Sequence, residues 1–107
     1  MEGLELISFQ IISAVGTARS MYIEAIEEAK NGGIVSARKL LDEGEKIFTE
    51  GHHAHAQLIQ QEASGDPVQM QLLLTHAEDQ LMSAEAFKII ASQFIDLYEK
   101  LHENKVI

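Results

Sequence analysis

The chain has 107 residues, of which 46% are hydrophobic, which predicts a single packed domain over 1–107. It contains no cysteine, which excludes disulfide bonds and thiolate metal sites. Its formal net charge of -9 would repel phosphate backbones, so we expect no nucleic-acid partner.

The N-terminal sequence MEGLELISFQ is acidic and has no basic region before its apolar residues, unlike a secretory signal peptide. No stretch approaches the roughly 18 unbroken apolar residues that a membrane span requires. We therefore expect a soluble, cytoplasmic protein that does not insert into the membrane.

Glycine and proline divide the chain into three segments with helical periodicity. The first runs from about Glu2 to Lys30 and ends at an Asn-Gly-Gly sequence, which is typical of a helix C-terminus. The second runs from about Ile34 to Ala63. Within it Gly44 and Gly51 each cost about 1 kcal/mol relative to alanine, and they indicate either a close approach between helices or a bend.

The third segment is expected to open at Asp66-Pro67, a capping residue followed by proline at the first helical position. It continues without a breaker to about His102, which we expect to be solvated in the last turn. Three long helices with short connections predict an all-α fold, an antiparallel up-down-up three-helix bundle.

The third segment carries more apolar surface than one bundle needs. At 100° per residue, a stripe around Asp79 contains Leu72, Met82, Ala86, Ile90 and Leu97. A second band contains Leu73, Ala77, Phe87, Ala91, Phe94, Ile95 and Tyr98. One band can face the helix's own bundle, and the other predicts a homo-oligomer with this helix near its centre. The alternative is a monomer whose first two helices enclose the third more fully.

Two polar residues interrupt this apolar surface. If Asp79 lies at a symmetry axis, its copies must share protons or bind a hard cation such as magnesium or calcium; otherwise it is an aspartate at a partly wet edge. His76 lies about 60° from Asp79 around the helix, at the edge of the stripe. A histidine there can act as nucleophile, base or ligand, although spacing alone favours a structural role.

The second segment contains a histidine cluster in the sequence EGHHAHAQ. Glu50 and His53 have the Glu-x-x-His spacing of di-iron bundles, but the complete set of two such pairs with two further glutamates is not evident. His52 and His55 are spaced to bind a transition metal such as zinc. This cluster supports an alternative function, a non-catalytic helical bundle that binds metal or a partner through His52, His53 and His55.

Three stretches of the sequence together resemble the IIA component of the lactose/cellobiose class of the bacterial phosphoenolpyruvate-dependent sugar phosphotransferase system. They are IISAVGTARSMYIEAIEEAKNG at 11–32, ARKLLDEGEKIFTEGHHAHAQLIQQEASGD at 37–66 and LLLTHAEDQLM at 72–82. The resemblance covers essentially the whole chain.

The resemblance implies a cytoplasmic homotrimer of three-helix subunits. It implies that His76 accepts a phosphoryl group from the histidine-containing phosphocarrier protein and passes it to the IIB component. It also implies that Asp79 and its symmetry mates bind a divalent cation, Mg²⁺, on the trimer axis. Gln80 stands where family members often have a second histidine. Glu78 stands where they often have glutamine, and its position around the helix predicts that it faces solvent. The sugar, whether lactose, cellobiose, chitobiose or another β-glucoside, cannot be read from a carrier that does not touch it.

Overall fold

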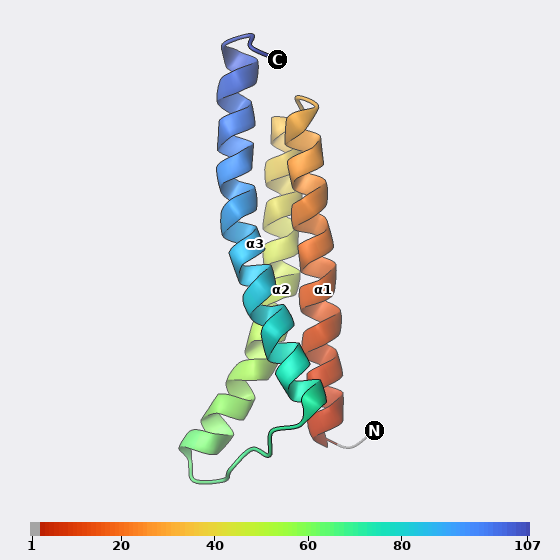
Figure 1. Ribbon diagram of the computed structural model, residues 1–107, viewed down its shortest axis with the longest axis vertical. Coiled ribbons are helices and arrows are strands. Elements are labelled where there is room, and N and C mark those ends of the chain that lie inside the picture. Colours follow the sequence, from red (N-terminus) through yellow and green to blue (C-terminus); the bar gives the residue numbers. More distant parts are fainter. Residues whose placement is uncertain (1–2) are drawn as a thin grey trace.

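A computed structural model describes residues 3–107 as three α-helices. These are α1 (Gly3–Lys30), α2 (Ile34–Ala63) and α3 (Leu72–Glu103). They run up, down and up, so the start of α1 and the end of α3 lie at opposite ends of an elongated molecule of 57 × 24 × 20 Å (Figure 1). The predicted all-α three-helix bundle is confirmed, while the predicted start of the first helix at Glu2 lies outside the described residues.

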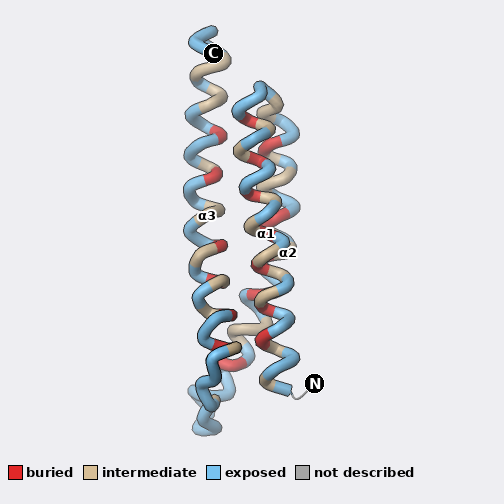
Figure 2. Tube along the Cα trace, turned by 45° about the vertical axis from the view of Figure 1, so that its right-hand side comes forward, coloured by how far each residue is buried: buried red, intermediate tan, exposed pale blue. Residues whose placement is uncertain are grey.

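Helix α1 lies between the other two helices and packs against both, whereas α2 and α3 touch each other much less. Its buried residues recur at three- and four-residue spacing, as the sequence predicted: Ser8, Ile11, Val15, Ala18, Tyr22, Ala25 and Ala29. Buried positions follow the inner side of the helices, and the outer sides are exposed (Figure 2). The hydrophobic core is therefore a narrow column along α1.

The two glycines inside α2 allow that helix to approach α1 closely. A Cβ atom at Gly44 would lie 2.7 Å from Cε1 of Tyr22, and one at Gly51 would lie 2.8 Å from Cγ1 of Val15. Relieving such contacts costs about 1–3 kcal/mol, which offsets the helix propensity that alanine would add. Close approach therefore explains both glycines, and the C-terminal part of α2 also diverges from α1 (Figure 1).

The predicted start of the third helix at Asp66-Pro67 is wrong. Helix α3 begins at Leu72, and its N-cap Gln71 is extended, with φ -122° and ψ 158°. Local capping signals favoured the earlier start, but the chain must first cross from the diverging end of α2 to the beginning of α3 (Figure 1). In this crossing Val68 is half-buried and lines a hollow of about 260 Å³ together with Leu4 and Ile7 of α1. The path of the connection thus overrides the local helix signal.

His102 is not solvated as the sequence suggested. Its Nε2 atom lies 3.2 Å from the carbonyl oxygens of both Ala29 and Lys30, at the C-terminal end of α1. Carbonyl groups in the last turn of a helix lack intrahelical partners. The imidazole of α3 therefore satisfies the end of α1 and fixes the two helices to each other there.

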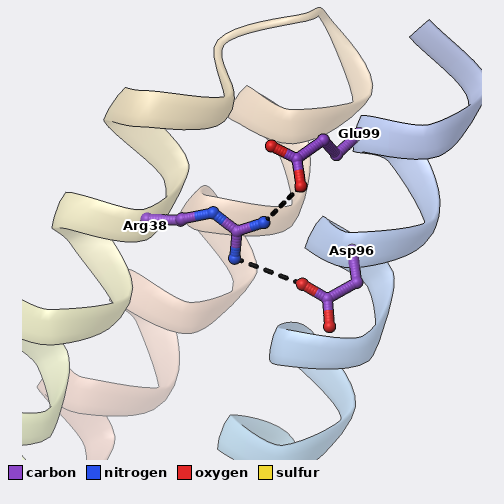
Figure 3. A network of polar contacts seen from close by, with 3 residues as sticks. All are labelled: Arg38, Asp96 and Glu99. Atoms are coloured by element: carbon purple, nitrogen blue, oxygen red, sulfur yellow. Dashed lines mark hydrogen bonds and ion pairs between the residues drawn. The ribbon is translucent and has the colours of Figure 1, made fainter. Parts of the chain in front are cut away.

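An ion-pair network ties α2 to α3 at the same end of the bundle (Figure 3). Arg38 donates to Asp96 at 3.2 Å and to Glu99 at 2.8 Å. The Arg38 side chain is 41% exposed, so screening by solvent limits each pair to about 1 kcal/mol or less. Because a helix rises about 1.5 Å per residue, this network lies roughly 30 Å along α3 from His76.

Candidate functional site

The outward stripe of α3 has no partner within the described chain. Four of its large side chains are strongly exposed, with Leu72 at 87%, Met82 at 70%, Ile90 at 48% and Leu97 at 49%. The second apolar band instead supplies the fully buried Ala77, Ala91 and Ile95, which pack inside the bundle. The prediction that one band faces the bundle and the other faces outward is therefore correct.

His76 and Asp79 lie near the start of α3, and both side chains are exposed. Neither takes part in any side-chain hydrogen bond or ion pair found within residues 3–107. A structural histidine is normally buried with its ring nitrogens paired. The structural interpretation that spacing alone favoured for His76 therefore has no support in its surroundings.

Two polar contacts from the other helices reach the helical turn that follows His76. Arg19 of α1 donates through Nη1 to Oε1 of Gln80, and both side chains are half-buried. His55 of α2 lies 3.5 Å from Glu78, with side-chain exposures of 18% and 36%. Glu78 therefore contacts α2 and is more than the surface charge that the sequence suggested.

Arg19 was not identified as a site residue from the sequence, although the sequence contains a feature that could have indicated it. It is the first basic residue of the chain, and it lies four residues after Val15 and three before Tyr22, both of which are buried. A charged residue beside the core face of an amphipathic helix needs a polar partner. That requirement indicates a cross-helix contact, but sequence spacing does not identify Gln80 as the partner.

The three histidines of the α2 cluster have different surroundings. His52 and His53 are exposed, and His52 stacks on Phe48 with ring centroids 6.2 Å apart. His55 turns toward α3 and contacts Glu78. Across residues 3–107 no three His, Cys, Asp or Glu side chains gather closely enough to hold a metal ion. The histidines of the cluster are therefore used for contacts with neighbouring side chains or are exposed to solvent. This arrangement argues against the alternative function.

A groove of about 930 Å³ opens between α1 and α2. Its lining includes Phe9 from α1 and Glu50 and His53 from α2, but neither His76 nor Asp79. His76 thus lies outside this groove, on an exposed position of α3.

Within the described part of the chain, no helix has an apolar stretch long enough to cross a lipid bilayer.

Together, the fold and the site define a class: a three-helix bundle that presents, on one helix, an exposed imidazole with no hydrogen-bond or ion-pair partner within residues 3–107. Such a surface suits contact with another macromolecule better than enclosure of a small substrate.

Comparison with known proteins places the chain within this class. Residues 6–99 match the family described as PTS system, Lactose/Cellobiose specific IIA subunit. The chain is 43% identical over 104 residues to the lichenan-specific phosphotransferase enzyme IIA component of Bacillus subtilis, covering 97% of this chain and 94% of that protein.

Solved structures agree with this result. The cellobiose-specific enzyme IIA of Bacillus anthracis superposes with a TM-score of 0.93 at 41% identity, over 96% of this chain and 94% of that one. The chitobiose IIA protein of Escherichia coli, solved in complex with HPr, gives a TM-score of 0.82 at 29% identity, over 95% and 99% of the chains. The chain belongs to the lactose/cellobiose-specific IIA family and is a IIA component of a sugar phosphotransferase system.

Proposed function

We propose that this chain carries a phosphoryl group on His76, accepting it from HPr, the histidine-containing phosphocarrier protein, and passing it to a IIB component in the cytoplasm. The observation that carries the proposal is the exposed imidazole of His76 on helix α3, which makes no side-chain hydrogen bond or ion pair within residues 3–107. A related IIA protein has been solved in complex with HPr, which supports HPr as the donor.

The chemistry requires only one nucleophile on this chain. The lone pair of a neutral imidazole nitrogen of His76 attacks the phosphorus, and the bond between phosphorus and the donor histidine nitrogen breaks. The electron pair of that bond returns to the donor ring, while each ring keeps the proton on its other nitrogen. In the second transfer a nucleophile of IIB attacks the phosphorus, the bond between phosphorus and the His76 nitrogen breaks, and its electron pair returns to the His76 ring. Phosphoryl transfer depends mainly on positioning and charge stabilisation, which an exposed site on a rigid helix permits.

Two of the relatives indicate the class of sugar that the complete system would take up. The similar proteins from two Bacillus species are specific for lichenan and for cellobiose. Both sugars are β-linked glucosides. We therefore propose that this chain belongs to a system for β-glucoside uptake. In such a system the carrier binds its protein partners, and the permease binds the sugar.

Mapping of the modified residue tests this function directly. The purified chain, incubated with phosphoenolpyruvate, the general phosphotransferase enzyme and HPr, should gain one acid-labile phosphoryl group, which peptide mass spectrometry places on His76. Addition of IIB should remove it. A phosphoryl group on His52, His53 or His55, or none at all, would overturn the proposal.

The outward stripe of α3 also supports a homotrimer with three α3 helices at its axis. Its large apolar side chains are exposed in the single chain, and symmetric assembly would bury them. Asp79 lies within this stripe, so three carboxylates would converge at the axis. Carboxylate oxygens are the ligands that hard cations such as Mg²⁺ prefer, and the bound ion would offset the repulsion among them. One chain supplies a single carboxylate to this site.

Replacing Asp79 with alanine should remove the bound cation and the dependence of stability on it. An ion that binds only the folded assembly at 100 times its Kd stabilises it by about 2.7 kcal/mol. We therefore expect Mg²⁺ to raise, and EDTA to lower, the thermal midpoint of the unmodified protein, with no such response in Asp79→Ala. Metal content by mass spectrometry is the second measurement.

The matched control is Glu85→Ala, which removes an exposed carboxylate from the polar side of the same helix. That variant should keep the metal and the Mg²⁺ response. Equal metal content in Asp79→Ala and the unmodified protein would show that Asp79 is not the ligand.

A further inference from the structure

The contact between Arg19 and Gln80 fixes which way the Gln80 amide points. A guanidinium has only hydrogen-bond donors, so the amide atom that faces Nη1 of Arg19 must be the oxygen. The amide is planar, so its NH₂ group lies on the other branch, about 120° away. This NH₂ group donates no hydrogen bond within residues 3–107. Arg19 thus holds a free amide donor in a defined orientation.

That donor lies beside His76. Gln80 follows His76 by four residues, and side chains with this spacing are neighbours on one helix face. Helical side chains also lean toward the N-terminus, which brings the Gln80 amide over the turn that carries His76. The position is half-buried, so a hydrogen bond there is less exposed to competition from water than one on an open surface.

The charges around His76 make such a donor necessary. Residues 66–87 contain no lysine or arginine, whereas Glu78 and Asp79 lie two and three residues after His76. A phosphoryl group on His76 would add further negative charge to this acidic turn. Arg19 supplies positive charge from α1, and Gln80 supplies a hydrogen-bond donor connected to it.

We infer that Gln80 donates its amide hydrogen to an oxygen of the phosphoryl group on His76, and that Arg19 is a positioning residue that orients Gln80 for this contact. The inference rests on the proposed role of His76. In this role Gln80, held in place by Arg19, stabilises the phosphoryl oxygens during transfer. Covalent bonds are still made and broken only at the histidine nitrogens.

Rates of phosphoryl transfer from HPr test the inference. Loss of one donor to a charged oxygen should slow transfer to Gln80→Leu about 10- to 100-fold. Arg19→Ala, which frees the amide to rotate, should slow it about 2- to 10-fold. Because Arg19 acts through Gln80, the double variant should be no slower than Gln80→Leu. A Gln80→Leu rate equal to that of the unmodified protein, or single effects that multiply in the double variant, would overturn the inference.

A spectroscopic measurement separates this role from simple packing. In ¹⁵N-labelled protein the side-chain amide resonance of Gln80, assigned by its loss in Gln80→Leu, should shift when His76 is phosphorylated. The amide of Gln93, an exposed residue further along α3, should not shift, and Gln93→Leu should transfer at the unmodified rate. An unchanged Gln80 resonance in a protein phosphorylated on His76 would refute the contact. Failure of the unmodified protein to become phosphorylated on His76 would instead refute the proposed function.

Discussion

Replacing His76 with glutamine is expected to abolish phosphorylation of this protein by HPr. Glutamine keeps a polar, hydrogen-bonding side chain at an exposed helical position, but its amide nitrogen has no free lone pair with which to attack phosphorus. Removal of a reacting nucleophile lowers the reaction rate by orders of magnitude. We therefore expect the initial rate of phosphorylation to fall at least about 1,000-fold. The measurement is incorporation of the phosphoryl group from phosphoenolpyruvate, followed by mass spectrometry of the intact chain.

The matched control is His53→Gln, the same substitution at an exposed histidine of α2. This variant should be phosphorylated at the unmodified rate, because His53 lines the groove between α1 and α2 and not the surface around His76. Both variants should keep the same helical circular dichroism. Incorporation that is indifferent to His76, or that depends on His53, would contradict the assignment.

The difference between these histidines shows how far sequence reasoning reaches. Helical periodicity predicted the exposed edge of α3 correctly, because burial along a helix follows the 100° angle between residues. It also separated the outward stripe from the band that contains the fully buried Ala77 and Ile95. Periodicity did not distinguish a structural from a reactive histidine at position 76, and only the family resemblance pointed to phosphorylation.

The contacts that sequence reasoning missed all join residues distant in the chain. Arg19 and Gln80 are 61 positions apart, and His102 and Ala29 are 73 apart. Such pairs depend on the relative rotation and offset of two helices, which the pattern within one helix does not specify. The predicted start of α3 was wrong for the same reason, since the chain must cross from the end of α2 to the beginning of α3, and Asp66-Pro67 alone does not specify the length of that crossing.

Helix α3 has two different surfaces on neighbouring faces. The turn that contains His76, Glu78 and Gln80 meets the other helices through polar contacts, while the stripe that contains Met82 and Ile90 is apolar and uncovered. If the stripe is an interface between copies of this chain, assembly would hold α3 in place while the histidine edge stays accessible. The two faces can therefore be separated by mutation.

Introducing glutamate at both Met82 and Ile90 is expected to abolish self-association while leaving the subunit folded. Burying a side chain of this size contributes about 1.5–3 kcal/mol, so losing two contacts should raise the dissociation constant at least about 100-fold. Carboxylates brought together at an axis would add repulsion. Both positions are exposed in the single chain, at 70% and 48%, so helical circular dichroism should be unchanged. Sedimentation equilibrium measures the subunit number.

Val35→Glu is the control, because it places the same charge on an apolar residue that is 85% exposed at the start of α2, away from the stripe. The unmodified chain and this variant should both sediment as trimers, and the Met82→Glu, Ile90→Glu chain as a single subunit. If the double variant remained a trimer, the three-fold contact would lie on another face. Three copies of Asp79 would then not meet at an axis, while the role of His76 as phosphoryl acceptor would still depend only on its own test.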